Sequence, residues 1–194
     1  MLYLRGRGGR LRRQFADLLD LRAGSAVLDV GSGTGSTALA LAAVVGETGS
    51  VTGVDPSPPM VAAASAKTRS RRGVRFLVAA AQALPFPDAS YDAVLSVLVM
   101  HHVPDELRAT ACREILRVLR PGGQLLIGDF EPPSGGLDRW VGAHRFRHPI
   151  SADHLPRLAD QLADAGAVDV HRHASPLGWL GLLHARRPEL PRNS

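Results

Sequence analysis

The sequence contains a single cysteine, Cys112, in 194 residues. One cysteine excludes an internal disulfide and a metal site built from several thiolates, and it favours a reducing compartment. Long apolar runs are missing too. The longest, Ala38–Val45, is far shorter than the roughly 18 residues that cross a bilayer. The N-terminal stretch has no apolar segment of the kind that a signal peptide needs. We therefore expect a cytoplasmic chain without a membrane span.

Lysine is almost absent, because Lys67 is the only one among 23 basic residues. The net charge of +5 has a local origin: five arginines precede the first acidic residue, Asp17, and beyond them basic and acidic residues are equal at 18 each. Because the excess of basic residues is confined to the N-terminal end, it favours a solvated arm over a nucleic-acid-binding surface. A nucleic-acid footprint stays open as the alternative.

Short β-type runs alternate with helical runs along almost the whole chain. The predicted strands lie at 26–30, 50–54, 74–78, 91–97, 124–130, 167–170 and 178–185. The predicted helices lie at 11–21, 37–45, 58–69, 155–162 and between an Asp105 cap and the Pro121-Gly122-Gly123 turn. This alternation predicts an α/β fold: a doubly wound, mostly parallel seven-stranded sheet with helices on both faces.

Two stretches lie outside the alternation. Residues 1–22 form a basic arm with one helix, and residues 23–194 are expected to form one Rossmann-like domain. Within that domain, the Pro/Gly-rich connection 131–150 follows the fifth strand. Because ligands of such sheets bind beyond the carboxyl ends of the strands, we expect this connection to be a substrate-side loop; an ordinary surface excursion is the alternative.

A glycine-rich loop, Gly31-Ser32-Gly33-Thr34-Gly35, joins the first predicted strand to a helix. Glycines let the backbone turn tightly and approach a ligand closely. Asp29 stands two residues before this loop, where a carboxylate would repel a pyrophosphate and suit a cationic ligand group. Alternatively, Asp29 only ties loop amides together. Asp55, at the end of the second strand, can accept both hydroxyls of a ribose, which indicates an adenosine-type ligand.

The chain resembles the class I S-adenosylmethionine-dependent methyltransferases, and within them the small-molecule branch that includes ubiquinone/menaquinone-type C-methyltransferases. The segments that carry the resemblance are Leu28–Gly35, Gly53–Ser57, Ala83–Asp92, His101–Asp105 and Leu116–Gly123. They occur in the family's order and cover roughly Val27 to Phe130. One departure stands out: the acidic residue that usually contacts the adenine amino group is replaced by Ala80. That loss would weaken cofactor binding by up to about tenfold.

The resemblance implies S-adenosylmethionine as cofactor, S-adenosylhomocysteine as its product, and methyl transfer to a small-molecule acceptor. The residues it places at the cofactor are Asp29, Gly31, Ser32, Gly33, Gly35, Asp55, Pro56, Met60, Ala81, Gln82 and Val97. Met60 either covers the adenine face or belongs to the core. With Ala80 in place of the acid, backbone groups around Ala81 or the side chain of Gln82 would hold the adenine.

In-line methyl transfer depends mainly on positioning, and a base assists where the acceptor is a phenol or a carbon acid. His101 follows the fourth strand and is the candidate catalytic base or acceptor-orienting residue; a purely structural role is the alternative. The candidate substrate residues are His102, Trp140, His144 and His148. The histidines show no metal-ligand spacing, so we expect no metal site.

Three other interpretations remain. A nicotinamide-dependent oxidoreductase shares the fold, but it would carry the G-x-G-x-x-G spacing. An RNA ribose methyltransferase would use the arginine-rich arm. A non-catalytic cofactor-binding member of the family would explain Ala80 and the short N-terminal region. That short region also suggests a homodimer in which the second copy supplies a lid.

Overall fold

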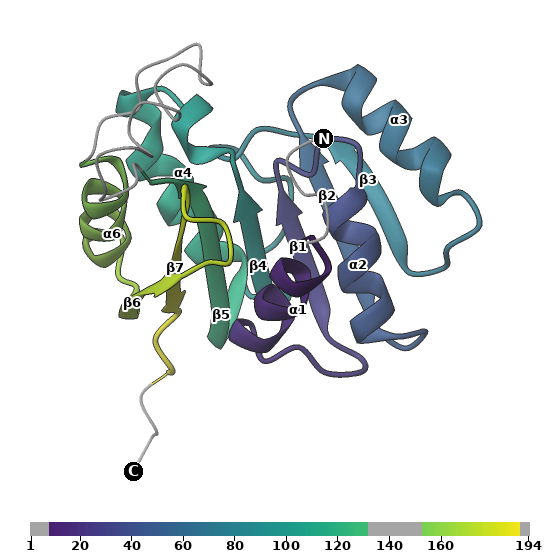
Figure 1. Ribbon diagram of the computed structural model, residues 1–194, viewed down its shortest axis with the longest axis horizontal. Coiled ribbons are helices and arrows are strands. Elements are labelled where there is room, and N and C mark those ends of the chain that lie inside the picture. The colour runs from purple at the N-terminus through teal and green to yellow at the C-terminus, as the bar shows by residue number, and fades with distance from the viewer. Residues whose placement is uncertain (1–7, 132–152, 191–194) are drawn as a thin grey trace.

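The computed structural model describes residues 8–131 and 153–190, and its centre is a seven-stranded sheet in the order β3-β2-β1-β4-β5-β7-β6 (Figure 1). The strands are β1 Ala26–Val30, β2 Ser50–Asp55, β3 Val74–Val78, β4 Tyr91–Val97, β5 Leu119–Phe130, β6 Val168–Ala174 and β7 Leu180–Arg186. The helices are α1 Gly8–Leu18, α2 Ser36–Val45, α3 Pro58–Thr68, α4 Asp105–Val118 and α6 His154–Asp164, with a short 3₁₀ turn, η2, at Met100–His102.

The strand pairing confirms the predicted doubly wound sheet. Strands β3, β2, β1, β4 and β5 are parallel neighbours, and β7 pairs antiparallel with both β5 and β6. The chain winds outward from β1 to β3, returns to β4 beside β1, and continues in the other direction. The strand order therefore reverses between β1 and β4, where open α/β sheets bind their ligands beyond the carboxyl ends.

Each face of the sheet has its own apolar core. On one face α1 and α2 pack through Leu11, Phe15 and Leu41 against buried residues of the central strands. On the other face α4 and α6 pack through residues such as Ile115 and Leu158. Because the central strands are covered on both sides, most of their residues are buried and apolar residues do not simply alternate with polar ones. None of the described helices is long and apolar enough to cross a membrane.

Several helices and strands begin or end at residues other than those predicted from the sequence. Helix α1 begins at Gly8 and ends at Leu18, earlier than the predicted 11–21, because Asp20 adopts a left-handed φ of 46° that stops the helix. Asp105 is the first residue of α4 rather than its cap, and it pairs with Arg108 at 2.7 Å.

Strand β5 starts at Leu119, ahead of the Pro-Gly-Gly segment that was expected to separate helix from strand. The backbone of Gly122 and Gly123 exchanges hydrogen bonds with Arg187, which draws this segment onto the sheet. Strand β6 is longer than the predicted 167–170. Strand β6 lies at the edge of the sheet, where polar side chains such as His171 and His173 are tolerated. Because of these polar residues, the sequence pattern did not indicate the full length of the strand.

Candidate active site at the carboxyl ends of the central strands

The glycine-rich loop leaves β1 directly beside the end of β2. The backbone N–H groups of Gly31 and Ser32 both donate to the carbonyl oxygen of Val54, at 2.7 and 2.9 Å. Gly31 has a φ of 74°, and a Cβ there would lie 2.0 Å from Cγ2 of Val99. Only glycine satisfies both constraints, so this position fixes the loop against the segment that follows β4.

Gly33 differs from its neighbours because it faces open space. Its φ is 51°, and a Cβ built on it would meet no atom of the described chain within 4 Å. The glycine therefore leaves open space beside the loop rather than avoiding an internal clash. Its backbone N–H donates to Oδ2 of Asp55 at 2.9 Å, which ties the loop to the end of β2.

Asp29 lies beneath this loop and is almost fully buried. Burial raises the pKa of Asp29 from its ordinary 3.8 to about 7; a backbone hydrogen bond from Ala38 opposes the shift, and the nearby Asp55 adds to it. The Oδ2 atom of Asp29 is buried and has no hydrogen-bond partner within the described residues. A buried carboxylate oxygen without a donor is suited to a cationic group. The bond from Ala38 ties Asp29 to the first turn of α2 rather than to an amide of the glycine-rich loop.

Asp55 presents a half-buried carboxylate at the end of β2. Its Oδ1 accepts the backbone N–H of Ser57 at 2.9 Å, and its Oδ2 accepts that of Gly33. Each carboxylate oxygen has a second lone pair, so both oxygens can still accept hydroxyl donors. Met60, in the first turn of α3, is 43% exposed. It therefore does not belong to the core, which removes one of the two roles considered for it.

The segment after β3 makes a tight turn at the same edge of the sheet. The N–H of Ala79 donates to the carbonyl of Asp55 at 3.2 Å, and Ala80 pairs with Ala83 in an isolated antiparallel bridge. Ala81 is buried and Gln82 partly buried at the tip of this turn. The two residues thus lie next in space to the end of β2.

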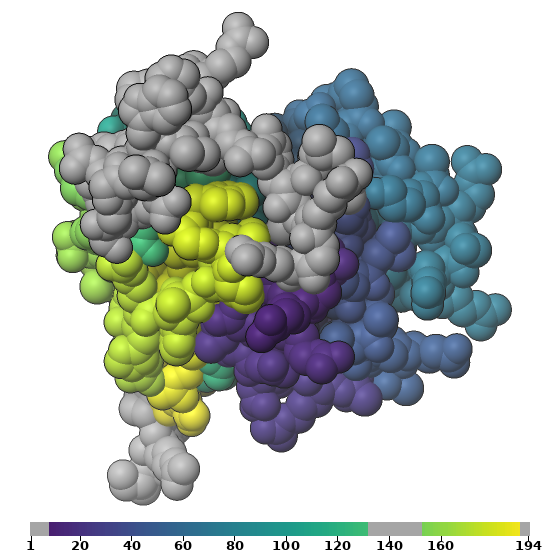
Figure 2. Space-filling model, in the orientation of Figure 1, coloured from purple at the N-terminus to yellow at the C-terminus, as the bar shows by residue number. Residues whose placement is uncertain are grey.

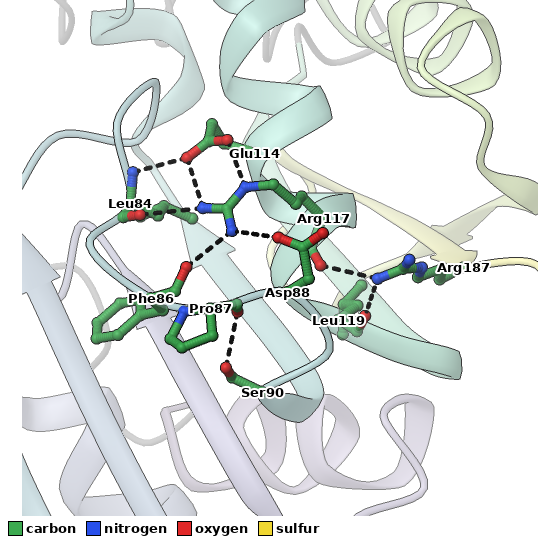
Figure 3. A network of polar contacts seen from close by, with 9 residues as sticks. All are labelled: Leu84, Phe86, Pro87, Asp88, Ser90, Glu114, Arg117, Leu119 and Arg187. Carbon is green, nitrogen blue, oxygen red and sulfur yellow. Dashed lines mark hydrogen bonds and ion pairs between the residues drawn. The ribbon is translucent and has the colours of Figure 1, made fainter.

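Arg117 of α4 holds the continuation of that segment (Figure 3). Its guanidinium donates to the carbonyl oxygens of Leu84 at 3.0 Å and Phe86 at 2.7 Å, and to Oδ1 of Asp88 at 2.8 Å. Glu114 accepts from Arg117 at 2.7 Å and from the N–H of Leu84 at 3.0 Å. Two of the sequence segments that carried the resemblance are therefore in direct contact.

A buried histidine–carboxylate pair lies beyond the ends of β4 and β5. Nδ1 of His101 is 2.7 Å from Oδ1 of Asp129, and the backbone N–H of His101 donates to Oδ2 at 3.0 Å. His154, at the start of α6, brings Nε2 to 3.3 Å from the same Oδ2. Burial alone would raise the pKa of Asp129, but the contacts with His101 and His154 outweigh it and hold that pKa well below its usual range.

The ionised Asp129 sets the tautomer of His101. An ionised carboxylate only accepts hydrogen bonds, so the proton of a neutral His101 ring lies on Nδ1. The other ring nitrogen, Nε2, then carries a lone pair and can accept a proton. The pair thus has the arrangement of a base and its orienting acid.

The structure brings most of the predicted site residues to one edge of the sheet. The loop residues, Asp55, Pro56, Met60, the Ala81–Gln82 turn, Val97, His101 and His102 all lie at or after the carboxyl ends of β1 to β4. Trp140, His144 and His148, like the rest of the connection 132–152, fall outside the described residues. No group of three or more His, Cys, Asp or Glu side chains in the described ranges 8–131 and 153–190 could hold a metal ion.

Sequence reasoning missed Asp129 and His154. One local signal could have pointed to Asp129, because it is the only acidic residue in the otherwise apolar end of β5. His154 offered no signal: it comes from a distant helix, and only the fold places it against β5.

Comparison with known proteins gives consistent matches. A family model described as a methyltransferase domain matches residues 27–123. The chain is 40% identical over 181 residues to the 27-O-demethylrifamycin SV methyltransferase of Amycolatopsis mediterranei, covering 86% of this chain and 64% of that protein. It is 34% identical over 173 residues to the 2-methyl-6-phytyl-1,4-hydroquinone methyltransferase of Synechocystis, covering 89% of this chain and 51% of that protein.

A solved structure shows the same fold. The crystal structure of a SAM dependent methyltransferase from Aquifex aeolicus superposes with a TM-score of 0.75 at 23% identity, and 93% of each chain is covered. The present chain spans between about half and two thirds of the length of the two relatives above. The hydroquinone enzyme among them agrees with the quinone-type branch that the sequence motifs resembled.

Proposed function

The chain belongs to the family of methyltransferase domains, and we propose that it transfers a methyl group from S-adenosylmethionine to a small-molecule acceptor. One observation carries this proposal. The glycine loop, with open space at Gly33, and the His101–Asp129 pair lie at the same edge of the sheet, on either side of the reversal between β1 and β4. Val99 packs on Gly31, and His101 follows two residues later, so the two halves of the site adjoin.

The residues at the loop fit the proposed cofactor. The Oδ2 atom of Asp29, which has no hydrogen-bond donor among the described residues, suits the positively charged methionine part of the cofactor. The open space at Gly33 leaves room for the cofactor, and the carboxylate of Asp55 suits its ribose hydroxyls. Met60, Ala81, Gln82 and Val97 would form the remaining contacts, with Pro56 beside Asp55. S-adenosylmethionine, when bound, supplies an electrophilic methyl group on sulfur.

His101 would act on the acceptor. Its Nε2 accepts the proton that a hydroxyl acceptor loses, and Asp129 stabilises the imidazolium that results. The rest of the rate enhancement would come from holding donor and acceptor in line, which supplies roughly 7–11 kcal/mol. His101 is thus the proposed catalytic residue, and Asp129 a positioning residue. His102 beside it would line the acceptor side.

The relatives' names indicate the acceptor class. One acts on an oxygen of a rifamycin and the other on a hydroquinone. We propose a hydroxylated or quinol-type small molecule as the acceptor here, with a cytoplasmic location and a homodimer as further proposals. Neither the nucleic-acid alternative nor the oxidoreductase is favoured by any contact described above.

The test uses the full chain, methyl-labelled S-adenosylmethionine and a panel of hydroquinones, phenols and alcohols, with transfer read by mass. We expect transfer to at least one hydroxylated acceptor. His101→Gln should lower turnover by about 10²–10⁴-fold while leaving the heat of cofactor binding unchanged. His171→Gln, on the exposed edge strand β6, is the matched control and should leave turnover unaltered.

The outcomes separate the alternatives. Cofactor binding without transfer to any acceptor would favour the non-catalytic interpretation. Transfer only to RNA would favour the ribose methyltransferase. If neither S-adenosylmethionine nor S-adenosylhomocysteine produces heat or raises the melting temperature, the proposed function is wrong.

A further inference from the structure

A small apolar cavity lies where α1, the start of α2, the end of β4 and the segment before β7 meet. Its volume is about 170 Å³. The lining residues are Gly8, Leu11, Arg12, Phe15, Thr37, Val97, Leu98, Leu177, Trp179 and Leu180. Gln14 of α1 donates to the carbonyl of Ala174 at 2.8 Å, which joins the helix to this segment. In Figures 1 and 2 the segment lies beside α1 on the face shown.

The cavity has the chemistry of a site for an apolar group. Most of its wall consists of carbon-rich side chains, and the polar exceptions are Arg12 and Thr37. An apolar cavity of about 150 Å³ stays dry and binds one benzene-sized molecule. The present volume therefore accommodates a single ring.

The wall of the cavity continues into the proposed active site. Leu98 has a left-handed φ of 60°, unusual for a bulky residue, and its N–H donates to the carbonyl of Gly128 at 2.7 Å. This hydrogen bond holds the end of β4 in a bend. Leu98 therefore lines the cavity while the next residue, Val99, packs on Gly31.

A row of aromatic rings links the cavity to the proposed base. The ring of Trp179 lies 5.6 Å from that of Phe130, and Phe130 lies 4.8 Å from His101. The proposed base and the cavity thus lie at the two ends of one row of packed aromatic rings. An elongated molecule could therefore reach both His101 and the cavity.

We propose that this cavity receives an apolar group of the acceptor, the size of one ring, while the methylated atom of the same molecule lies at His101. The inference rests on the proposed function and narrows it. It selects elongated hydrophobic acceptors that carry such a group and disfavours small polar ones. Residues of the cavity wall, Leu177 in particular, then determine acceptor specificity without taking part in the chemistry.

Toluene, as a ring-sized probe, tests the cavity without any turnover. The chain has two tryptophans, so Trp140→Phe leaves Trp179 as the only one. Toluene titrated into that protein should change the Trp179 fluorescence saturably. Leu177→Phe, which fills the cavity, should weaken toluene binding by about tenfold or more. Leu190→Phe is the matched control, because Leu190 is 70% exposed, and it should change nothing.

Enlargement of the cavity gives a second measurement that is independent of how well Leu177→Phe folds. Leu177→Ala should bind naphthalene at least about tenfold more tightly than the parent protein does, because the truncated side chain enlarges the cavity. For turnover, a pair of acceptors with and without a ring-sized apolar substituent is compared. Leu177→Phe should lower kcat/KM about tenfold for the substituted acceptor only.

The results distinguish this proposal from the proposed function. Absence of saturable toluene binding, or equal binding by the parent and both Leu177 variants, overturns the cavity proposal even if S-adenosylmethionine binds normally. Saturable toluene binding without any heat from S-adenosylmethionine overturns the methyltransferase proposal, and with it the acceptor role of the cavity.

Discussion

Asp129 joins His101 to His154. One of its oxygens lies 2.7 Å from Nδ1 of His101, and the other lies 3.3 Å from Nε2 of His154. The carboxylate is fully buried between elements that are distant in the sequence. A buried charge needs such partners, since an unpaired one costs several kcal/mol. The arrangement therefore both stabilises the end of β5 and orients the proposed base.

Asp129→Asn should lower the turnover by about 10²–10⁴-fold, because the amide no longer stabilises a protonated His101. The loss should appear in kcat and leave KM for the acceptor unchanged, since Asp129 orients the proposed base and touches no substrate. A purely structural role would instead lower the melting temperature together with the activity. Calorimetry should give an unchanged affinity for S-adenosylmethionine.

The pKa of Asp29, raised by burial to about 7, makes stability depend on pH. Between its ordinary value of 3.8 and about 7, the folded protein keeps a proton that the unfolded chain has lost. The free energy of unfolding should therefore decrease as pH rises through this range. Asp29→Asn should remove this part of the decrease and melt above the parent protein at pH 8. Thermal melts from pH 4 to 8 measure it, and parallel curves for the two proteins would contradict it.

Gly33→Val should abolish binding of S-adenosylmethionine, because the added side chain would occupy the open space beside the loop where the cofactor is proposed to bind. Gly46 provides a matched control: it also has a positive φ, and a Cβ there also meets nothing within 4 Å. Both variants should lose stability from the backbone strain of a left-handed β-branched residue. Only Gly33→Val should lose the heat of binding. Unaltered affinity in this variant would place the ligand elsewhere.

Arg117→Lys should lower the free energy of unfolding by about 1–3 kcal/mol, since lysine cannot reproduce the forked contacts to Leu84, Phe86 and Glu114 (Figure 3). Urea denaturation measures the loss. Arg113→Lys, on the exposed side of the same helix, should cost almost nothing. Equal midpoints for the two variants would show that the contacts of Arg117 contribute nothing to stability.

The central sheet could be predicted from the sequence because its information is local. The runs that became β1 and β2 are short, bounded by turn residues and buried along most of their length, and the glycines after β1 have positive φ angles that few other residues adopt. Asp29 and Asp55 could be identified as candidates for the same reason, because the motifs beside them are local. The structure shows where the two residues lie, and their roles stay predictions.

What escaped prediction depends on contacts between distant segments. The partnership of Asp129 with His154 exists only once α6 has packed on β5. The bend at Leu98 breaks a local rule, and the bond to Gly128 that supports it comes from the neighbouring strand. The cavity likewise forms only where α1 packs beside the segment before β7, and neither sequence predicts that the two segments meet.

The close packing of Val99 on Gly31 joins the glycine loop to the segment that follows β4. A ligand bound at the loop would therefore lie next to the strand end at which Leu98 lines the cavity. We expect the order of addition to reflect this: S-adenosylmethionine enters first and fixes the shape that the second reactant meets.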